Sequence, residues 1–172
     1  MQTAPAGRQF MQGGTDMEKN ITIRPERVSD YQQVEDIIRQ AFYNLYTPGC
    51  TEHYLAHAIR PHPDFLPELD LVLELDGRVV GNIMYTKSTL VDEAGKEKGI
   101  LTFGPVCIRP GLQRRGYGRL LMEESFRRAS AMGYEAIVIF GDPNNYVGRR
   151  LPKAAKSTGS IWRTGRIPPR CW

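Results

Sequence analysis

Residues 105–121 read PVCIRPGLQRRGYGRLL, and this stretch decides how the chain is organised. It starts as an apolar, β-branched run, breaks at Pro110-Gly111, and continues through a Gly-x-Gly step into a helix-periodic segment that reaches Met132. This order predicts a strand, a tight loop and a helix.

The loop between this strand and helix has the features of a phosphate-binding site. The first turn of a helix has unpaired backbone N–H groups and a partial positive charge. Gly116 and Gly118 have no side chain that would keep a ligand away. Three arginines add charge and paired donors: Arg114, Arg115 and Arg119. We therefore expect an anionic ligand that carries a diphosphate.

Two familiar phosphate loops do not fit this stretch. A P-loop has Gly-Lys-Ser/Thr where this chain has Gly116-Tyr117-Gly118, and a dinucleotide fingerprint needs a small residue where Leu121 stands. The residues QRRGYG, 113–118, match instead the [Gln/Arg]-x-x-Gly-x-[Gly/Ala] signature, so the chain resembles the GNAT N-acetyltransferase superfamily.

The resemblance extends over residues 21–146, which follow the order of elements in that family. Residues 141–146, GDPNNY, are similar to the Gly-Asp-Pro-x-Tyr-Tyr segment of the YhbS-like branch. The resemblance implies an α/β (α+β) fold. Its sheet would be mixed and mostly antiparallel, with a parallel, splayed pair of fourth and fifth strands and flanking helices.

The residue patterns outside the central stretch predict elements that fit this fold. Ser29 and Gln32 have the spacing of a capping box for a first helix. A short helix follows Thr51, and a third helix spans 116–132. The predicted strands are 21–24, 71–74, 78–90, 100–108 and 135–140. A helix joins the last two, so they should be parallel, and Pro105 predicts a bulge or an edge in the fourth.

Length and composition predict one soluble domain. The 172 residues are 41% hydrophobic and 24% charged, and no apolar run approaches the length of a membrane span. Three cysteines without close spacing suggest neither a disulfide framework nor a zinc site, so we expect a reducing cytoplasm. We interpret residues 1–16 as a flexible leader, 17–146 as the acetyltransferase domain and 147–172 as an atypical tail.

The tail departs from the family pattern. Relatives continue after the tyrosine with an Arg, then Gly-Phe, and then two closing strands that complete the acceptor site. Residues 147–172 have no Gly-Phe and no strand alternation; they carry seven Lys or Arg residues and no Asp or Glu. A change of reading frame is one hypothesis, because Arg150-Leu151 written as CGG-CTT contains the codon for Gly and the start of Phe one base later.

The resemblance implies acetyl-CoA as cosubstrate and no metal. The pantetheine arm would enter between the fourth and fifth strands and pair with backbone N–H groups around Val106, Cys107 and Ile108. The remaining cofactor-binding candidates are Gln113, Arg114, Arg115, Gly116, Tyr117, Gly118, Arg119 and Asn144, with Asn145 as an alternative to Asn144.

Catalytic groups are harder to identify from the sequence. Tyr146 is a candidate proton donor to the leaving thiolate, although an aromatic residue can also simply pack beneath its loop. Glu74 and Glu52 are candidate general bases, and water relayed from a carboxylate would serve as well. Cys107 has no His or Asp nearby in the sequence to activate it, so we expect a small packing residue and no covalent catalysis. His53 and His57, four residues apart, lack a third zinc ligand.

These observations favour an N-acetyltransferase that transfers an acetyl group to a primary amine by direct attack in a ternary complex. The alternative is a catalytically weak or inactive acyl-CoA-binding protein of the same fold. Nucleic-acid binding through the basic tail is a weaker reading, because the tail has no known motif. The acceptor remains open among small amines, antibiotics, peptide N-termini and lysine. A homodimer is also left open, and no membrane partner is expected.

Overall fold

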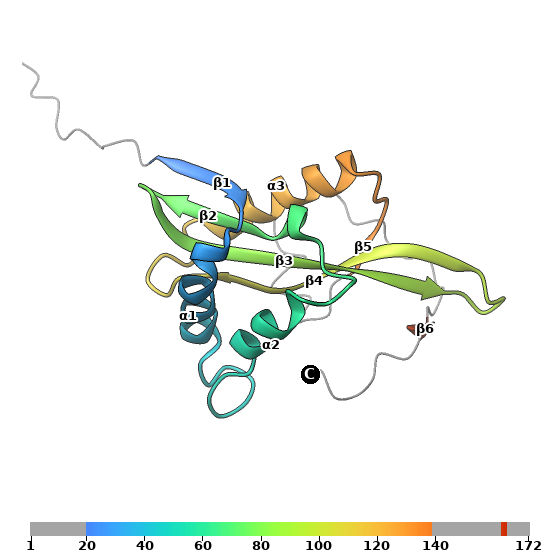
Figure 1. Cartoon of the computed structure of the whole chain (residues 1–172), viewed down its shortest axis with the longest axis horizontal. Helices are drawn as coiled ribbons and strands as arrows, with labels where there is room; N and C mark the ends of the chain where they lie inside the picture. Colours follow the sequence, from blue (N-terminus) through green and yellow to red (C-terminus); the bar gives the residue numbers. More distant parts are fainter. Residues whose placement is uncertain (1–19, 139–162, 165–172) are drawn as a thin grey trace, which may run out of the picture.

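The strands form one sheet in a computed structural model that describes residues 20–138 and 163–164. The strand order is β1-β2-β3-β4-β5, and β6 pairs with β3 off this path (Figure 1). The bounds are β1 Ile21–Pro25, β2 Leu71–Leu75, β3 Arg78–Val91, β4 Glu97–Ile108, β5 Ile137–Val138 and β6 Arg163–Thr164. Neighbours from β1 to β4 are antiparallel, whereas β4 and β5 are parallel. This confirms the expected mixed, mostly antiparallel sheet.

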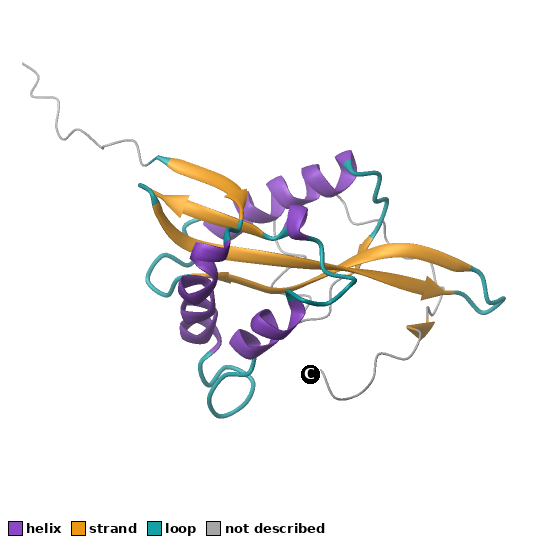
Figure 2. Ribbon diagram, viewed as in Figure 1, coloured by secondary structure: helices purple, strands orange, loops and turns teal. Residues whose placement is uncertain are grey.

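Helices cover both faces of this sheet (Figure 2). The α-helices are α1 Tyr31–Phe42, α2 Glu52–Ile59 and α3 Tyr117–Ala131, and two short 3-10 helices are η1 Val28–Asp30 and η2 Pro67–Leu69. Buried residues of α3 pack with one set of strand side chains, and those of α1 and α2 pack with the other set. Within the described residues, none of the helices is both long and apolar enough for a membrane span.

Alternation along the strands divides the core into these two layers. On β2, Leu71 and Leu73 belong to the cluster that includes α3, whereas Val72 between them belongs to the cluster that includes α1 and α2. Successive side chains of a strand point to opposite faces, so an apolar run with helices on both sides is buried throughout. Each such side chain contributes about 1.5–3 kcal/mol on burial.

The start of α1 differs from the predicted capping box. Ser29 lies inside η1, and α1 begins at Tyr31. The carboxylate of Asp30 instead closes the start of η1, because its Oδ2 accepts the backbone N–H of Arg27, the N-cap residue of η1, at 2.8 Å. The helix α1 follows with Asp30 as its N-cap residue and no side-chain cap. The Asp30 carboxylate also accepts a hydrogen bond from Arg24 of β1 at 2.6 Å. A charged acceptor makes a stronger hydrogen bond to a backbone N–H than a neutral hydroxyl does, so the chain is capped at Arg27 and Asp30 instead of Ser29 and Gln32.

The last two strands are short, and only the first of them was predicted. The fifth strand was predicted at 135–140 and is described at Ile137–Val138, with residues 139–140 outside the described part. In the tail, Arg163 and Thr164 pair with Val91 and Leu90 of β3. The described part of the tail is therefore paired with β3.

Candidate functional site

A bulge interrupts β4 just before the central stretch. Between the pairs Tyr85↔Phe103 and Ile83↔Val106, β4 has one residue more than β3, and the extra residue falls at Gly104-Pro105. Such a bulge bends a strand and leaves part of its backbone unpaired. The break that Pro105 predicts is therefore present.

Beyond the bulge, the backbone N–H and C=O groups of successive β4 residues point alternately toward β3 and away from it. The N–H of Arg109 donates to the carbonyl of Val80 on β3 at 2.7 Å. Residues two apart in a strand face the same neighbour, so the backbone of Cys107 also faces β3. The backbone groups of Val106 and Ile108 face away from β3, toward the side on which β5 pairs. This side can accept a ligand along the strand.

The loop after β4 is held in place by Gln113. Its side-chain Nε2 donates to the backbone carbonyl of Ile108 at 3.1 Å, and the N–H of Leu112 donates to Arg109 at 3.0 Å. Arg114 has a positive φ of 61°, which is uncommon for a residue with a side chain. Gln113 thus positions the loop against the strand end, a role that the signature alone did not specify.

The loop ends at the N-terminus of α3. Gly116 is the N-cap residue in a left-handed conformation, with φ of 89°. The first intrahelical bond runs from Leu120 N–H to its carbonyl at 3.1 Å, so the N–H groups of residues 117–119 have no intrahelical acceptor. An added Cβ on Gly116 would meet no heavy atom within 4 Å, whereas one on Gly118 would touch Ile108. Among the described residues, the space next to Gly116 is therefore open.

Three exposed arginines surround this helix end: Arg114, Arg115 and Arg119. Arg119 forms an ion pair with Glu123 one turn later, at 3.0 Å. The side chain of Tyr117 is buried in the core beside α3, so only its backbone N–H is available to a ligand. Helix dipole, N–H groups and guanidinium groups together favour an anion.

The thiol of Cys107 is unsuited to nucleophilic attack. Its side chain packs in the cluster that includes α1 and α2 and is 5% exposed. Burial raises the pKa of the Cys107 thiol to about 12, so almost no thiolate forms at neutral pH. The residue behaves as the small hydrophobe that the sequence predicted.

The two candidate bases are engaged elsewhere. Glu74 lies on β2, separated from β4 by β3, and its Oε1 accepts hydrogen bonds from Arg24 at 2.9 and 2.6 Å. The carboxylate of Glu52 accepts the N–H of Thr51 at 3.1 Å and the thiol of Cys50 at 3.3 Å. The structure brings the cofactor candidates of residues 106–119 together, but it does not place Glu74 with them.

The remaining predicted residues divide between those outside the described part of the chain and the two histidines of α2. Tyr146, Asn144 and Asn145 lie outside the described residues. His57 contacts Glu35 at 3.3 Å, and Nδ1 of His53 is buried without a hydrogen-bond partner among the described residues. In the described ranges no group of three or more His, Cys, Asp or Glu side chains could hold a metal ion.

Gly81 on β3 is a site residue that the sequence analysis did not single out. An added Cβ there would overlap the side chain of Ile108 and lie 2.9 Å from the carbonyl of Cys107. Only glycine allows β3 and the end of β4 to approach this closely. A glycine inside the apolar run VVGNIMY, residues 79–85, was the available signal.

The comparisons with known proteins agree with this geometry. The model of the acetyltransferase (GNAT) family matches residues 31–154. A GNAT family acetyltransferase from Brucella melitensis, solved with acetyl-CoA, is 29% identical with a TM-score of 0.64, covering 74% of this chain and 80% of its own. The GNAT family N-acetyltransferase YhbS from Escherichia coli, solved with CoA, is 26% identical with a TM-score of 0.64, covering 78% and 70%.

A search among curated proteins finds no match. The family match nevertheless spans well over half of the sequence and includes the bulged strand, the glycine loop and α3. The chain therefore belongs to the GNAT acetyltransferase family.

Proposed function

We propose that this protein is an acetyl-CoA-dependent N-acetyltransferase that acts on a primary amine by direct attack in a ternary complex. One observation carries the proposal. The bulged end of β4, with backbone groups that face away from β3, is followed by a short loop and then by a helix N-terminus that has N–H groups without an intrahelical acceptor and three arginines. A long ligand with an acyl group at one end and a diphosphate at the other matches this sequence of features. The complexes of the two relatives with acetyl-CoA and CoA support the same assignment.

The diphosphate would bind at the start of α3. Phosphate oxygens accept the N–H groups of residues 117–119, and Arg114, Arg115 and Arg119 supply charge. The pantetheine arm would lie along β4 and bond with the backbone of Val106 and Ile108, which faces away from β3. The side chain of Gln113 already occupies one lone pair of the Ile108 carbonyl and keeps this strand end in register with the loop.

The chemistry requires little covalent help from the protein. An uncharged amine attacks the thioester carbonyl and an oxyanion forms; the C–S bond then breaks as the thiolate leaves, and the nitrogen gives up one proton to water. The N–H groups of the β4 end would polarise the carbonyl, and Tyr146 is the proposed proton donor to the thiolate. A carboxylate acting through water would take the proton of the ammonium; Glu52 and Glu74 are the candidates among the acids already named. The buried, neutral thiol of Cys107 supports direct transfer.

The described part of the tail favours a second candidate function. Arg163–Thr164 pairs with β3, so these two residues do not extend the sheet beyond β5. If no other segment closes the acceptor side, the protein would bind CoA through residues 106–119 and turn over weakly or not at all. Restoring a Gly-Phe-containing closing segment would then recover turnover.

Two measurements separate these candidates. Calorimetric titration with CoA tests the binding site, and release of free CoA thiol with a panel of amines and acetyl-CoA tests transfer. We expect measurable CoA binding, and turnover with at least one primary amine supports the enzyme. Binding without turnover on any amine supports the CoA-binding protein, whereas absence of CoA binding by the folded chain refutes both.

A further inference from the structure

Two threonine hydroxyls meet on neighbouring strands close to the bulge in β4. Thr86 of β3 lies opposite Thr102 of β4 in the sheet register, and their Oγ1 atoms are hydrogen bonded at 2.9 Å. Both residues are half-buried. Thr102 is also the last of the described β4 residues that pairs with β5, where its partner is Val138. The hydroxyl pair therefore lies between the part of β4 that is paired with β5 and the bulge at Gly104-Pro105.

The hydroxyl pair belongs to the face of the sheet that α1 and α2 cover. Phe103 of β4 and Tyr85 of β3 pack in the cluster that includes α3. Successive side chains of a strand point to opposite faces, so Thr102 and Thr86 point to the other face. Thr86 also forms a bridge with Phe65, which packs in the cluster of α1 and α2. Residues directly opposite each other in a ladder share a face, so this bridge agrees with the placement.

The proposed acetyl-CoA site brings the acyl end of the cofactor next to this pair. With the diphosphate at the start of α3 and the pantetheine along Ile108 and Val106, the remaining atoms of the cofactor continue backward along β4 to Gly104. Gly104 has no side chain, and an added Cβ there would meet no heavy atom of the described residues within 4 Å. The thioester carbonyl would therefore lie beside Gly104.

The spacing along β4 suits an amine held between this carbonyl and Thr102. Two residues of a strand span about 7 Å. A nitrogen poised for attack lies about 3–3.5 Å from the carbonyl carbon, and a hydrogen bond from its N–H to a hydroxyl oxygen adds about 3 Å. One amino group therefore bridges the distance from a carbonyl beside Gly104 to the hydroxyl of Thr102.

Aromatic side chains fill the opposite face at this level. Tyr85, Phe103 and Phe126 of α3 are stacked there, with ring centroids 5.4 and 6.2 Å apart. Tyr85 is fully buried, and its hydroxyl is hydrogen bonded to Ser125 at 2.8 Å. The acceptor should therefore approach β4 from the face that carries the hydroxyl pair.

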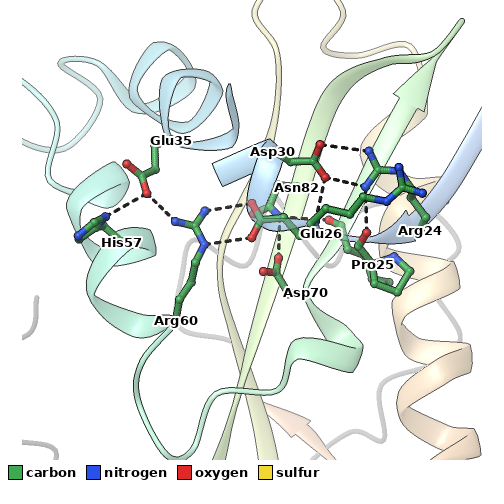
Figure 3. Close-up of polar contacts among 11 residues, drawn as sticks. Arg24, Pro25, Glu26, Asp30, Glu35, His57, Arg60, Asp70 and Asn82 are labelled. Carbon is green, nitrogen blue, oxygen red and sulfur yellow. Dashed lines mark hydrogen bonds and ion pairs between the residues drawn. The ribbon is translucent and has the colours of Figure 1, made fainter. Parts of the chain in front are cut away.

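The acidic side chains at the junction of α1, α2 and β1 are already paired (Figure 3). Arg60 follows α2, and its Nε and Nη2 donate to the two carboxylate oxygens of Glu26 at 3.0 Å each. Its Nη1 donates to Glu35 of α1. The side chain of Glu26 is only 1% exposed. These two acids hold three elements together and are not free to bind a substrate amine.

The hydrogen bond within the threonine pair leaves capacity for a ligand. A hydroxyl has one proton and two lone pairs. The hydroxyl that donates within the pair keeps both of its lone pairs, and the one that accepts keeps one lone pair and its proton. An N–H of a primary amine can donate to any of these lone pairs, and the lone pair of the nitrogen then stays free to attack the carbonyl.

On the basis of the proposed function, we propose that the Thr86–Thr102 pair binds the acceptor amine. Thr102 accepts an N–H of the amine beside the thioester carbonyl. Thr86 does not contact the amine and acts as a positioning residue, because its hydrogen bond fixes the orientation of the Thr102 hydroxyl.

Steady-state kinetics of the full chain, with acetyl-CoA and an amine that the wild type acetylates, test this assignment. Thr102→Val keeps the branched shape and removes the hydroxyl, whereas Thr102→Ser keeps the hydroxyl. We expect kcat/KM for the amine to fall about tenfold in Thr102→Val and to stay within about threefold in Thr102→Ser. The KM for acetyl-CoA should stay within about twofold in both. A role in sheet stability alone would favour the valine variant, because valine suits a strand better than serine does.

Two variants of β3 complete the set, and thermal unfolding confirms that each variant is folded. Thr86→Val removes the partner of Thr102 and should lower kcat/KM for the amine about threefold, with little further loss when it is added to Thr102→Val. Thr89→Val changes an exposed threonine of the same strand, opposite Gly99, and should leave the kinetics unchanged.

The outcomes separate this assignment from the proposed function. A kcat/KM for the amine in Thr102→Val within about twofold of wild type overturns the assignment and leaves the proposed function standing. An equal loss in Thr102→Val and Thr102→Ser also overturns it, because the hydroxyl would then not be responsible. If the wild type binds CoA but acetylates no amine of the panel, the proposed function fails and the assignment fails with it.

Discussion

Replacing Gly116 by valine separates cofactor binding from folding, because α3 has a matching glycine at its other end. Gly116 and Gly133 have φ values of 89° and 88°, and an added Cβ at either position would meet no heavy atom of the described residues within 4 Å. A β-branched side chain at such a φ costs about 1–3 kcal/mol of folding free energy. We expect Gly116→Val and Gly133→Val to be destabilised by similar amounts.

Only the first substitution should affect CoA. The isopropyl group of Gly116→Val occupies the free space over the N–H groups of residues 117–119. Hydrogen bonds to a charged group contribute about 1.5–3 kcal/mol each. Losing two of them removes at least about 3 kcal/mol, which corresponds to a Kd about 100-fold higher.

Thermal unfolding and calorimetric titration with CoA measure the two effects on the same samples. Gly133→Val should bind CoA as wild type does, because Gly133 lies beyond the opposite end of α3. A Kd for Gly116→Val within threefold of wild type would refute the assignment of the diphosphate to this helix end. Equal weakening of CoA binding in both variants would show that the cause is destabilisation of the fold rather than a local obstruction of the phosphate site.

Three other substitutions test neighbouring parts of the argument. Cys107→Ala should keep kcat within about threefold and lose about 1 kcal/mol of stability; an acetyl group trapped on Cys107 by mass spectrometry would contradict this. Glu123→Gln frees Arg119 and should tighten CoA binding about two- to fivefold in low salt but not in 0.5 M NaCl; an unchanged Kd in low salt would show that Arg119 does not reach the phosphates. Glu74→Gln should lower stability by about 1–3 kcal/mol through its pairing with Arg24; a 100-fold loss of kcat at unchanged stability would instead identify Glu74 as the base.

The fold follows from local signals to a large extent. β4 ends at Ile108 and α3 begins at Tyr117, as the apolar run and the Gly-x-Gly step predict, and Gly133 follows the helix end with φ of 88°. Local reasoning failed at Ser29, because the capping contacts form between Arg27 and Asp30 at the start of η1, and α1 continues from η1 without a side-chain cap. The pattern of residues did not indicate the short 3-10 turn that precedes α1.

The candidate site divides in the same way. The glycine loop and its arginines are contiguous in the sequence, so their shared location could be predicted. Gln113 was placed at the site, but its bond to the Ile108 carbonyl depends on how the loop folds back. The pairing of Thr86 with Thr102 was missed, because it depends on the register of β3 against β4, which the sequence of either strand alone does not give.

The close packing at Gly81 has a consequence for redesigning the protein. There is no room for even a methyl group on Gly81 beside Ile108. Any larger residue at position 81 would therefore displace the backbone at the end of β4. Attempts to accommodate longer acyl groups beside β4 should therefore leave position 81 as glycine. Variation is better directed to the opposite flank of β4, where the backbone of Val106 and Ile108 faces away from β3.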